Sequence, residues 1–248
     1  MTSRTTIFIA TFPEITHNLY NMKKLSVNTA IPLSDIDFIL LDMDGTLLDR
    51  YFDDYFWEHL VPEKYAVKHN ITFGKAKEEL MKKYRVHEGT LNWTDLHFWS
   101  KELSLDIPAL KEQIKHLIEV HPHVEDFLQM MKNHRKKVCL LTNAHYASID
   151  LKLRKTQIGR YFHFVLSSFD AGYPKESLGF WKEAEKQLGF KKERALFIDD
   201  TEEVLKTAKQ YGIKYIIHKA HANSRIKPQM SKDFVHILDF GELLQHFR

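Results

Sequence analysis

The chain lacks the features that mark secreted or membrane proteins: it has a single cysteine, Cys139, and no run of about 20 apolar residues. One cysteine cannot form an internal disulfide, which fits a reducing compartment, so we expect a cytoplasmic protein. The missing apolar run predicts no contact with a membrane, and the short apolar segment before Pro13 is a poor secretion signal.

A strong charge of one sign is also missing. The net charge is +3, and lysines lie in short clusters interleaved with glutamates, as on a solvated helix face, so we expect no nucleic-acid partner. The 248 residues are 44% hydrophobic, which suffices for one core domain and a smaller second one. No internal repeat or low-complexity linker divides them. We expect a monomer or a small homo-oligomer.

Two aspartates follow a short apolar run. Residues 38–41 read as a buried strand, and Asp42 and Asp44 come just past its end, where open α/β sheets bind ligands. Because residues two apart in a strand-like segment point to the same side, both carboxylates can face one substrate, where one attacks and the other moves a proton. The alternatives are an acidic turn and a calcium loop, and the leucines at 47–48 argue against calcium.

Three later segments carry side chains suited to a phosphoryl group. Thr142 and Asn143 end a second apolar run, and hydroxyl and backbone amide groups at a strand end can hold phosphoryl oxygens. Lys175 lies in a turn before a helical stretch and offers a fixed positive charge. Asp199 and Asp200 end a third apolar run. Each segment alone is ambiguous, but together and in this order they predict a phosphoryl-transfer site.

The acidic residues of these segments imply a metal ion. Ionised Asp42, Asp199 and Asp200 would place about three negative charges where a phosphate must enter, and Coulomb repulsion opposes this in a partly dry cleft. A divalent cation relieves the repulsion. Mg²⁺ is favoured because it binds carboxylate and phosphate oxygens, with Mn²⁺ or another divalent ion as the alternative. With Mg²⁺ and Lys175 present, Asp44 can stay protonated and act as a general acid.

The pattern of apolar residues predicts an α/β fold. Helix and strand patterns alternate after Pro122, which is typical of a parallel sheet with covering helices. The predicted strands are 138–141, 162–166, 195–198 and 213–217, and the predicted helices are 124–133, 146–156, 177–188 and 202–211.

A helical segment interrupts this alternation between residues 49 and 122. It has amphipathic runs over 74–87, 94–103 and 107–120, with Thr94 and Asp106 as predicted N-caps. We expect a poorly ordered extension over residues 1–33, an α/β core over 34–50 and 122–248, and a helical cap domain over 51–121.

Four segments resemble the motifs of the haloacid dehalogenase (HAD) superfamily of phosphotransferases: LLDMDGTLLD from residue 40, LLTNAH from residue 140, GYPKE from residue 172 and FIDDTE from residue 197. The resemblance implies a Rossmann-like parallel-sheet core with an α-helical cap inserted after the first strand. It also implies an Mg²⁺-dependent phosphatase, and the acid at Asp44 favours phosphate chemistry over dehalogenation.

The same resemblance implies a role for each motif residue. Asp42 would be the nucleophile that forms an aspartyl-phosphate, and Asp44 would protonate the leaving oxygen and then deprotonate the hydrolytic water. Thr142 and Lys175 would stabilise the phosphoryl oxygens. The implied metal ligands are Asp42, the backbone carbonyl of Asp44, and Asp199 or Asp200.

Aromatic and amide side chains of the expected cap are candidates for substrate recognition. Aromatic rings can stack on a nucleobase, and amide and carboxylate groups can hydrogen-bond to its edge. The candidates are Phe52, Tyr55, Asn92 and Trp93, with His145 after the second motif. The alternative for the aromatic residues is cap core, and for His145 it is a helix start.

A closer similarity covers both regions of the chain. The segments FDDYFW, LVPE and TLNW of the expected cap, together with the four motifs, resemble the bacterial GMP/IMP 5′-nucleotidase branch of the superfamily. This implies hydrolysis of purine nucleoside 5′-monophosphates such as GMP and IMP. The alternatives are a phosphatase for a sugar phosphate or a phosphoglycolate-type substrate, a phosphomutase, and a non-catalytic binding module.

The start of the native protein is a separate hypothesis. Met22 is followed by two lysines, and we hypothesise that it, and not Met1, is the first residue. Intact-mass analysis of the native protein should then find a chain that begins at Met22 or Lys23. A chain that begins at Met1 or Thr2 would reject the hypothesis.

Overall fold

The computed structural model describes residues 31–247. Residues 1–30 of the expected extension therefore lie outside the described residues. The hypothesised start at Met22 lies outside them as well. Within 31–247, every helix is too short or too polar to cross a membrane.

Six parallel strands form one sheet in the order β3-β2-β1-β4-β5-β6. They are β1 (Phe38–Leu41), β2 (Lys137–Thr142), β3 (Phe164–Ser167), β4 (Ala195–Asp199), β5 (Tyr215–Lys219) and β6 (His236–Ile237). The apolar strand β1 lies near the centre with all its residues buried. The strand order reverses beside β1, and open sheets bind ligands at such a point. The predicted α/β fold class is confirmed.

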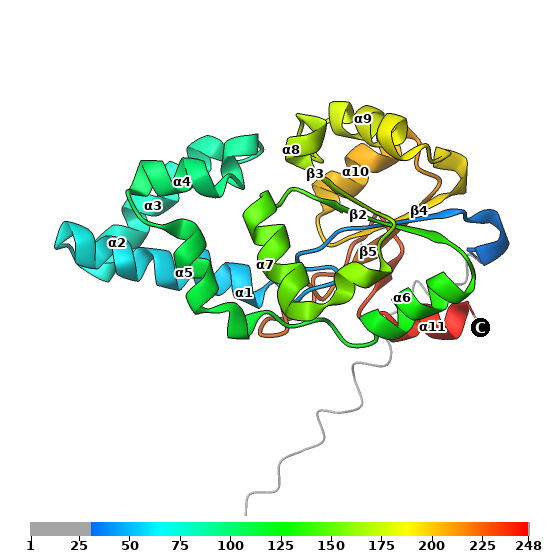
Figure 1. The fold of residues 1–248 in the computed structure, drawn as a ribbon, viewed down its shortest axis with the longest axis horizontal. Helices are drawn as coiled ribbons and strands as arrows, with labels where there is room; N and C mark the ends of the chain where they lie inside the picture. Colours follow the sequence, from blue (N-terminus) through cyan, green and yellow to red (C-terminus); the bar gives the residue numbers. More distant parts are fainter. Residues whose placement is uncertain (1–30, 248) are drawn as a thin grey trace, which may run out of the picture.

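Helices cover both faces of the sheet (Figure 1). One face carries α6 (Val124–Asn133), α7 (Tyr146–Thr156) and α11 (Gly241–His246), and the other carries α8 (Ser168–Ala171), α9 (Leu178–Leu188) and α10 (Glu202–Tyr211). Successive residues of β1 point to opposite faces, so Ile39 and Leu41 join one core while Phe38 and Leu40 join the other. Burial on both faces fixes the register of β1, and with it the position of the residues that follow.

Between β1 and β2 the chain forms a block of helices to one side of the sheet (Figure 1). Its α-helices are α1 (Tyr51–Tyr55), α2 (Val61–His69), α3 (Phe73–His87), α4 (Leu96–Leu103) and α5 (Ile107–Gln113), with a π-helical turn at Phe56–Leu60 and 3-10 turns at Leu91–Trp93 and Lys115–Leu117. We call residues 51–121 the helical block. Its buried side chains belong to the same hydrophobic cluster as those under α6 and α7. That this block works as a cap domain stays a prediction.

The predicted N-cap of α4 is wrong by one residue. Asp95, and not Thr94, caps this helix, because its carboxylate accepts hydrogen bonds from the backbone N–H groups of His97 at 2.8 Å and Phe98 at 3.1 Å. The predicted cap of α5 is confirmed, since the side chain of Asp106 accepts from a backbone N–H in the first turn.

The helix predicted over residues 107–120 is too long. It ends at Gln113, a 3-10 turn follows, and Val120 then pairs with Leu48 as the chain returns to the sheet. Buried apolar residues continue through this stretch, and periodicity alone does not separate a short helix from buried extended chain. The two-residue strand β6 and the short helices α8 and α11 were not predicted, because so few residues carry no periodic signal.

The centre of the sheet should tolerate truncation least. Leu40 on β1 is fully buried, whereas Val165 on the edge strand β3 is 41% exposed. We expect Leu40→Ala to lower the free energy of unfolding by about 2–5 kcal/mol, through lost burial and a new cavity, and Val165→Ala to change it by less than about 1 kcal/mol. Urea unfolding followed by circular dichroism measures both values. Equal losses would contradict this placement of the core.

Candidate active site

Three neighbouring strands bring the predicted acidic and hydroxyl side chains together. Asp42 follows β1, Thr142 ends β2 and Asp199 ends β4, and β1 lies between the other two strands. The backbone N–H of Asp42 donates to the carbonyl of Ile198 at 3.0 Å, which extends the pairing of β1 with β4 by one residue. Asp42 and Asp199 are therefore neighbours because the strands are in register, although they are far apart in the sequence.

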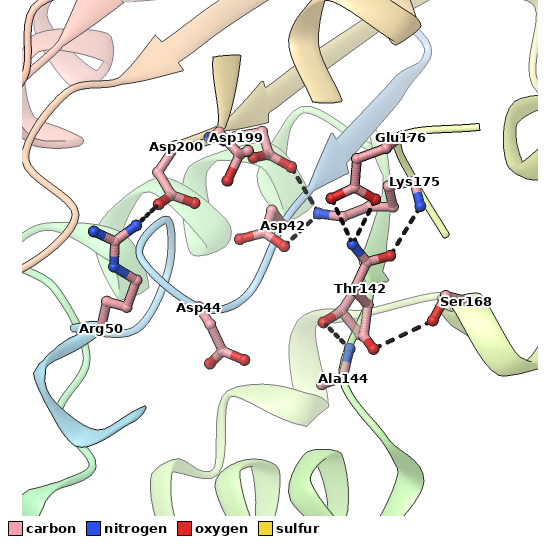
Figure 2. Close-up of polar contacts among 12 residues, drawn as sticks. Asp42, Asp44, Arg50, Thr142, Ala144, Ser168, Lys175, Glu176, Asp199 and Asp200 are labelled. Carbon is pink, nitrogen blue, oxygen red and sulfur yellow. Dashed lines mark hydrogen bonds and ion pairs between the residues drawn. The ribbon is translucent and has the colours of Figure 1, made fainter. Parts of the chain in front are cut away.

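Lys175 lies between these two carboxylates (Figure 2). Its ammonium donates to Oδ1 of Asp42 at 2.5 Å and to Oδ2 of Asp199 at 2.7 Å, and all three residues are buried. Asn143 holds the loop that carries the lysine. Its side-chain carbonyl accepts from the backbone N–H of Lys175 at 2.9 Å, and its amide donates to Glu176 at 2.9 Å. Asn143 thus orders the lysine, and its predicted contact with phosphate stays a prediction.

Burial raises the pKa of each acid in this cluster. Removal from water is the largest cause, and it raises the pKa of Asp42 and of Asp200 to about 7 and that of Asp199 to about 6. Burial by itself would lower the pKa of Lys175, but the carboxylates of Asp199 and Asp42 outweigh this effect and raise it. The lysine is thus a fixed cation between Asp42 and Asp199.

The acidic cluster fits a divalent cation. Oxygens of Asp42, Asp199 and Asp200 lie within 4.8 Å of one another. Oδ2 of Asp42 is buried and has no hydrogen-bond partner among residues 31–247, so it is available to an ion. Carboxylate oxygens in this arrangement are typical ligands of Mg²⁺, which completes its shell with water and substrate oxygens. Arg50 donates to Oδ2 of Asp200 at 2.9 Å and fixes that side chain at the edge of the cluster.

Gly45 lets the loop after β1 pass close to Asp200. Its φ of +91° is one that L side chains rarely adopt, and a Cβ there would lie 2.5 Å from Oδ2 of Asp200. The loop closes through the N–H of Gly45, which donates to the carbonyl of Leu48 at 2.7 Å. Any larger residue would displace the loop or the acidic cluster.

Asp44 points away from the carboxylate of Asp42 (Figure 2). Its own carboxylate lies 2.6 Å from the ammonium of Lys152, which is buried in α7. Burial raises the pKa of Asp44, and Lys152 opposes the rise. Asp42 and Asp44 line one cavity, but a lysine holds each of them from a different side.

A cavity of about 560 Å³ opens at this cluster. Motif side chains line one part of it: Asp42, Asp44, Thr142, Asn143, Lys175 and Asp200. Aromatic side chains of the helical block line another part: Trp57, Tyr84, Trp93 and Trp99. A volume of this order is typical of pockets that enclose a small molecule.

The structure brings only some of the predicted substrate contacts to this cavity. Trp93 and His145 line it, while Phe52, Tyr55 and Asn92 are not among its lining residues. Phe52 is buried beneath the ammonium of Lys111, 4.8 Å from its ring centre, and Tyr55 stacks on His59. These two rings pack within the helical block, which is the alternative that the sequence left open. His145 is also the N-cap of α7, since Nδ1 accepts from a backbone N–H.

Several charged residues that line the cavity were not among the predicted site residues, and they include Arg50, Asp53, Lys111 and Lys152. Arg50 directly follows the first motif, so a place beside the acidic cluster could have been inferred for it. Lys152 and Asp53 are 99 positions apart and pair only because α7 and α1 meet in space. No local pattern carries that information.

Comparison with known proteins agrees with this geometry. A family model of haloacid dehalogenase-like hydrolases matches residues 36–212. The chain is 37% identical over 214 residues to the GMP/IMP nucleotidase YrfG of Escherichia coli (strain K12), which covers 86% of this chain and 96% of that protein. The GMP/IMP nucleotidase YrfG of Shigella flexneri matches with the same identity and coverage.

Solved structures share the fold. A HAD phosphatase from Thermococcus onnurineus superimposes with a TM-score of 0.71 at 21% identity, over 85% of this chain and 97% of that one. CbbY from Rhodobacter sphaeroides superimposes with a TM-score of 0.63 at 15% identity, over 86% of this chain and 99% of that one. At these identities the likeness supports the architecture, and the chemistry is argued from the site itself.

Binding of Mg²⁺ to the acidic cluster should depend on pH. Because the pKa values of its carboxyl groups are raised to about 6 or 7, these groups hold protons in acid and must release them before they bind a cation. We therefore expect excess Mg²⁺ to raise the melting temperature more at about pH 8 than at about pH 5.5. Differential scanning fluorimetry measures both shifts.

A matched pair of variants controls this measurement. Asp42→Asn removes the ligand that both metal arrangements share and should lose most of the shift at about pH 8, while Asp150→Asn, which changes an exposed aspartate on α7, should keep it. A shift that is equal at both pH values, or that survives Asp42→Asn, would contradict the metal site.

Proposed function

The chain belongs to the haloacid dehalogenase-like hydrolases, and from this premise we propose that it is an Mg²⁺-dependent phosphatase for purine nucleoside 5′-monophosphates such as GMP and IMP. Its family and its nucleotidase relative make it a phosphoric monoester hydrolase, and the choice of substrate is the proposed step. The observation that carries the proposal is the cavity that joins Asp42 and Lys175 to aromatic side chains of the helical block.

Asp42 is the proposed nucleophile. Lys175 holds one of its oxygens at 2.5 Å, which restrains the carboxylate before a substrate arrives. A carboxylate oxygen of Asp42 attacks phosphorus, the bond between phosphorus and the 5′ oxygen breaks, and an aspartyl-phosphate forms. Mg²⁺ bound by Asp42 with Asp199 or Asp200 would supply the positive charge that a phosphate dianion needs among these acids.

Asp44 is the proposed acid and base. It gives a proton to the 5′ oxygen as that bond breaks, so the nucleoside leaves as an alcohol. A water molecule then attacks the phosphorus of the aspartyl-phosphate and gives a proton to Asp44, and the bond to Asp42 breaks to release phosphate. Thr142 and Lys175 are the proposed contacts of the phosphoryl oxygens. The Thr142 hydroxyl already accepts from the N–H of Ala144 at 3.0 Å, which fixes its direction.

The walls of the cavity support a nucleotide as the substrate. Trp93 lines the cavity yet is 40% exposed, so its ring has surface left for a planar base. Glu58 and Glu88 also line the cavity. A carboxylate accepts a hydrogen bond from the N1–H of a 6-oxopurine, which adenine lacks, and this favours GMP and IMP over AMP. A sugar phosphate or a phosphoglycolate-type substrate would gain little from aromatic walls.

A panel of phosphate esters tests the proposal. With Mg²⁺ we expect phosphate release to be fastest from GMP and IMP among a set that adds AMP, UMP, a sugar phosphate and phosphoglycolate. Asp42→Asn should lower kcat/KM by at least about 10³-fold, because it removes the nucleophile, while Asp150→Asn should leave it unchanged. Colorimetric phosphate determination measures each rate, and a chelator should abolish it.

Other outcomes would replace the proposal with an alternative. A preference for the sugar phosphate or phosphoglycolate would refute the nucleotide substrate and keep the hydrolase. Transfer of the phosphoryl group between substrate hydroxyls without free phosphate would identify a phosphomutase. Binding without turnover would indicate a non-catalytic module.

A further inference from the structure

A row of two buried lysines and two partly buried carboxyl groups connects Asp44 to the helical block. The ammonium of Lys152 lies 2.6 Å from Oδ1 of Asp44 and 2.6 Å from Oδ2 of Asp53. The ammonium of Lys111 lies 2.6 Å from Oδ1 of the same Asp53. The row therefore holds two lysines and two carboxyl groups, and its two lysines are among the most deeply buried side chains between residues 31 and 247.

Its four members come from different parts of the fold. Asp44 belongs to the loop after β1, Asp53 to α1 and Lys111 to α5, so two members lie in the helical block. Lys152 belongs to α7, which covers the sheet, and it reaches the loop and the block at once. The orientation of Asp44 is therefore tied to the place where the block meets the sheet.

Lys152 is not needed to neutralise the negative charge of Asp53. Lys111 already pairs with Asp53, and its ammonium lies over the rings of Phe52 and Phe56 at 4.8 Å and 4.6 Å. Apolar side chains often replace a buried ion pair without loss of stability, so burial of a second lysine here is weak evidence for a stabilising role. What Lys152 adds is its contact with Asp44.

We propose that Lys152 is a positioning residue for proton transfer. Its ammonium contacts both Asp53 and Asp44, and it thereby sets the direction from which Asp44 donates a proton to the leaving oxygen. The inference rests on the proposed function for the role of Asp44. Asp53 is part of the helical block, so a movement of the block would shift Asp53 and change the contact between Lys152 and Asp44.

The leaving group distinguishes this role from a structural one. The 5′ oxygen of a nucleoside leaves only when it receives a proton, whereas p-nitrophenolate leaves without one. The ratio kcat/KM reports the steps up to the first cleavage, so it separates the action of Asp44 on the leaving group from its later action on water. A misplaced Asp44 therefore lowers kcat/KM for alkyl phosphates and spares p-nitrophenyl phosphate.

Lys152→Met tests the inference, because it removes the ammonium and keeps a long apolar side chain. We expect kcat/KM to fall about 10²-fold for the alkyl phosphate that the wild type hydrolyses best, and less than about fivefold for p-nitrophenyl phosphate. Lys152→Arg keeps the charge and should recover about tenfold of the loss. Lys155→Met makes the same change at an exposed position of the same helix and should alter neither value.

Equal losses on both substrates, or no loss on either, would overturn the inference, since a structural role does not distinguish leaving groups. If circular dichroism shows that Lys152→Met does not fold, Asp53→Asn takes its place. That variant leaves Lys152 with Asp44 as its remaining carboxylate, and the same selective loss is expected. Asp42→Asn is assayed in parallel. If it still releases phosphate, the proposed function fails whatever the effect at Lys152.

Discussion

The ammonium of Lys175, held between the carboxylates of Asp42 and Asp199, is the interaction on which the site depends. Two buried carboxylates would repel each other and the acid beside them, and a cation between them makes their proximity tolerable. That position exists only because β1 and β4 are paired in register and Asn143 holds the loop of the lysine. Sheet geometry therefore determines the electrostatics of the site.

A second lysine acts on the other side of the same loop. Lys175 approaches from the loop before α9 and Lys152 from α7, and each divides its ammonium between two carboxylates. Gly45 lies next to Asp44 and lets the loop run against the acidic cluster. The proposed nucleophile, Asp42, and the proposed acid, Asp44, are thus restrained from opposite sides before a substrate binds.

The parts of the site that follow strands could be predicted from the sequence. Short apolar runs identified β1, β2 and β4, whose ends lie at the same edge of a parallel sheet. The residues after Leu41, Leu141 and Ile198 meet because β1 lies between the other two strands, an order that the sequence did not predict. The contacts of the helical block could not be predicted in the same way. Phe52 and Trp93 are both aromatic, yet one is buried under Lys111 and the other lines the cavity. Residue type does not say which way a ring faces, and ion pairs between distant segments leave no local pattern.

The strand order also has a consequence for synthesis on the ribosome. β1 pairs with β2 on one side and with β4 on the other, so a nascent chain carries a half-paired central strand until residues 195–199 emerge. An apolar strand with a free edge invites pairing with the wrong partner. A product truncated before β4 would therefore be a substrate for chaperones and proteases and would have no residual activity. Until β4 has been made, the central strand of the sheet stays open on one side.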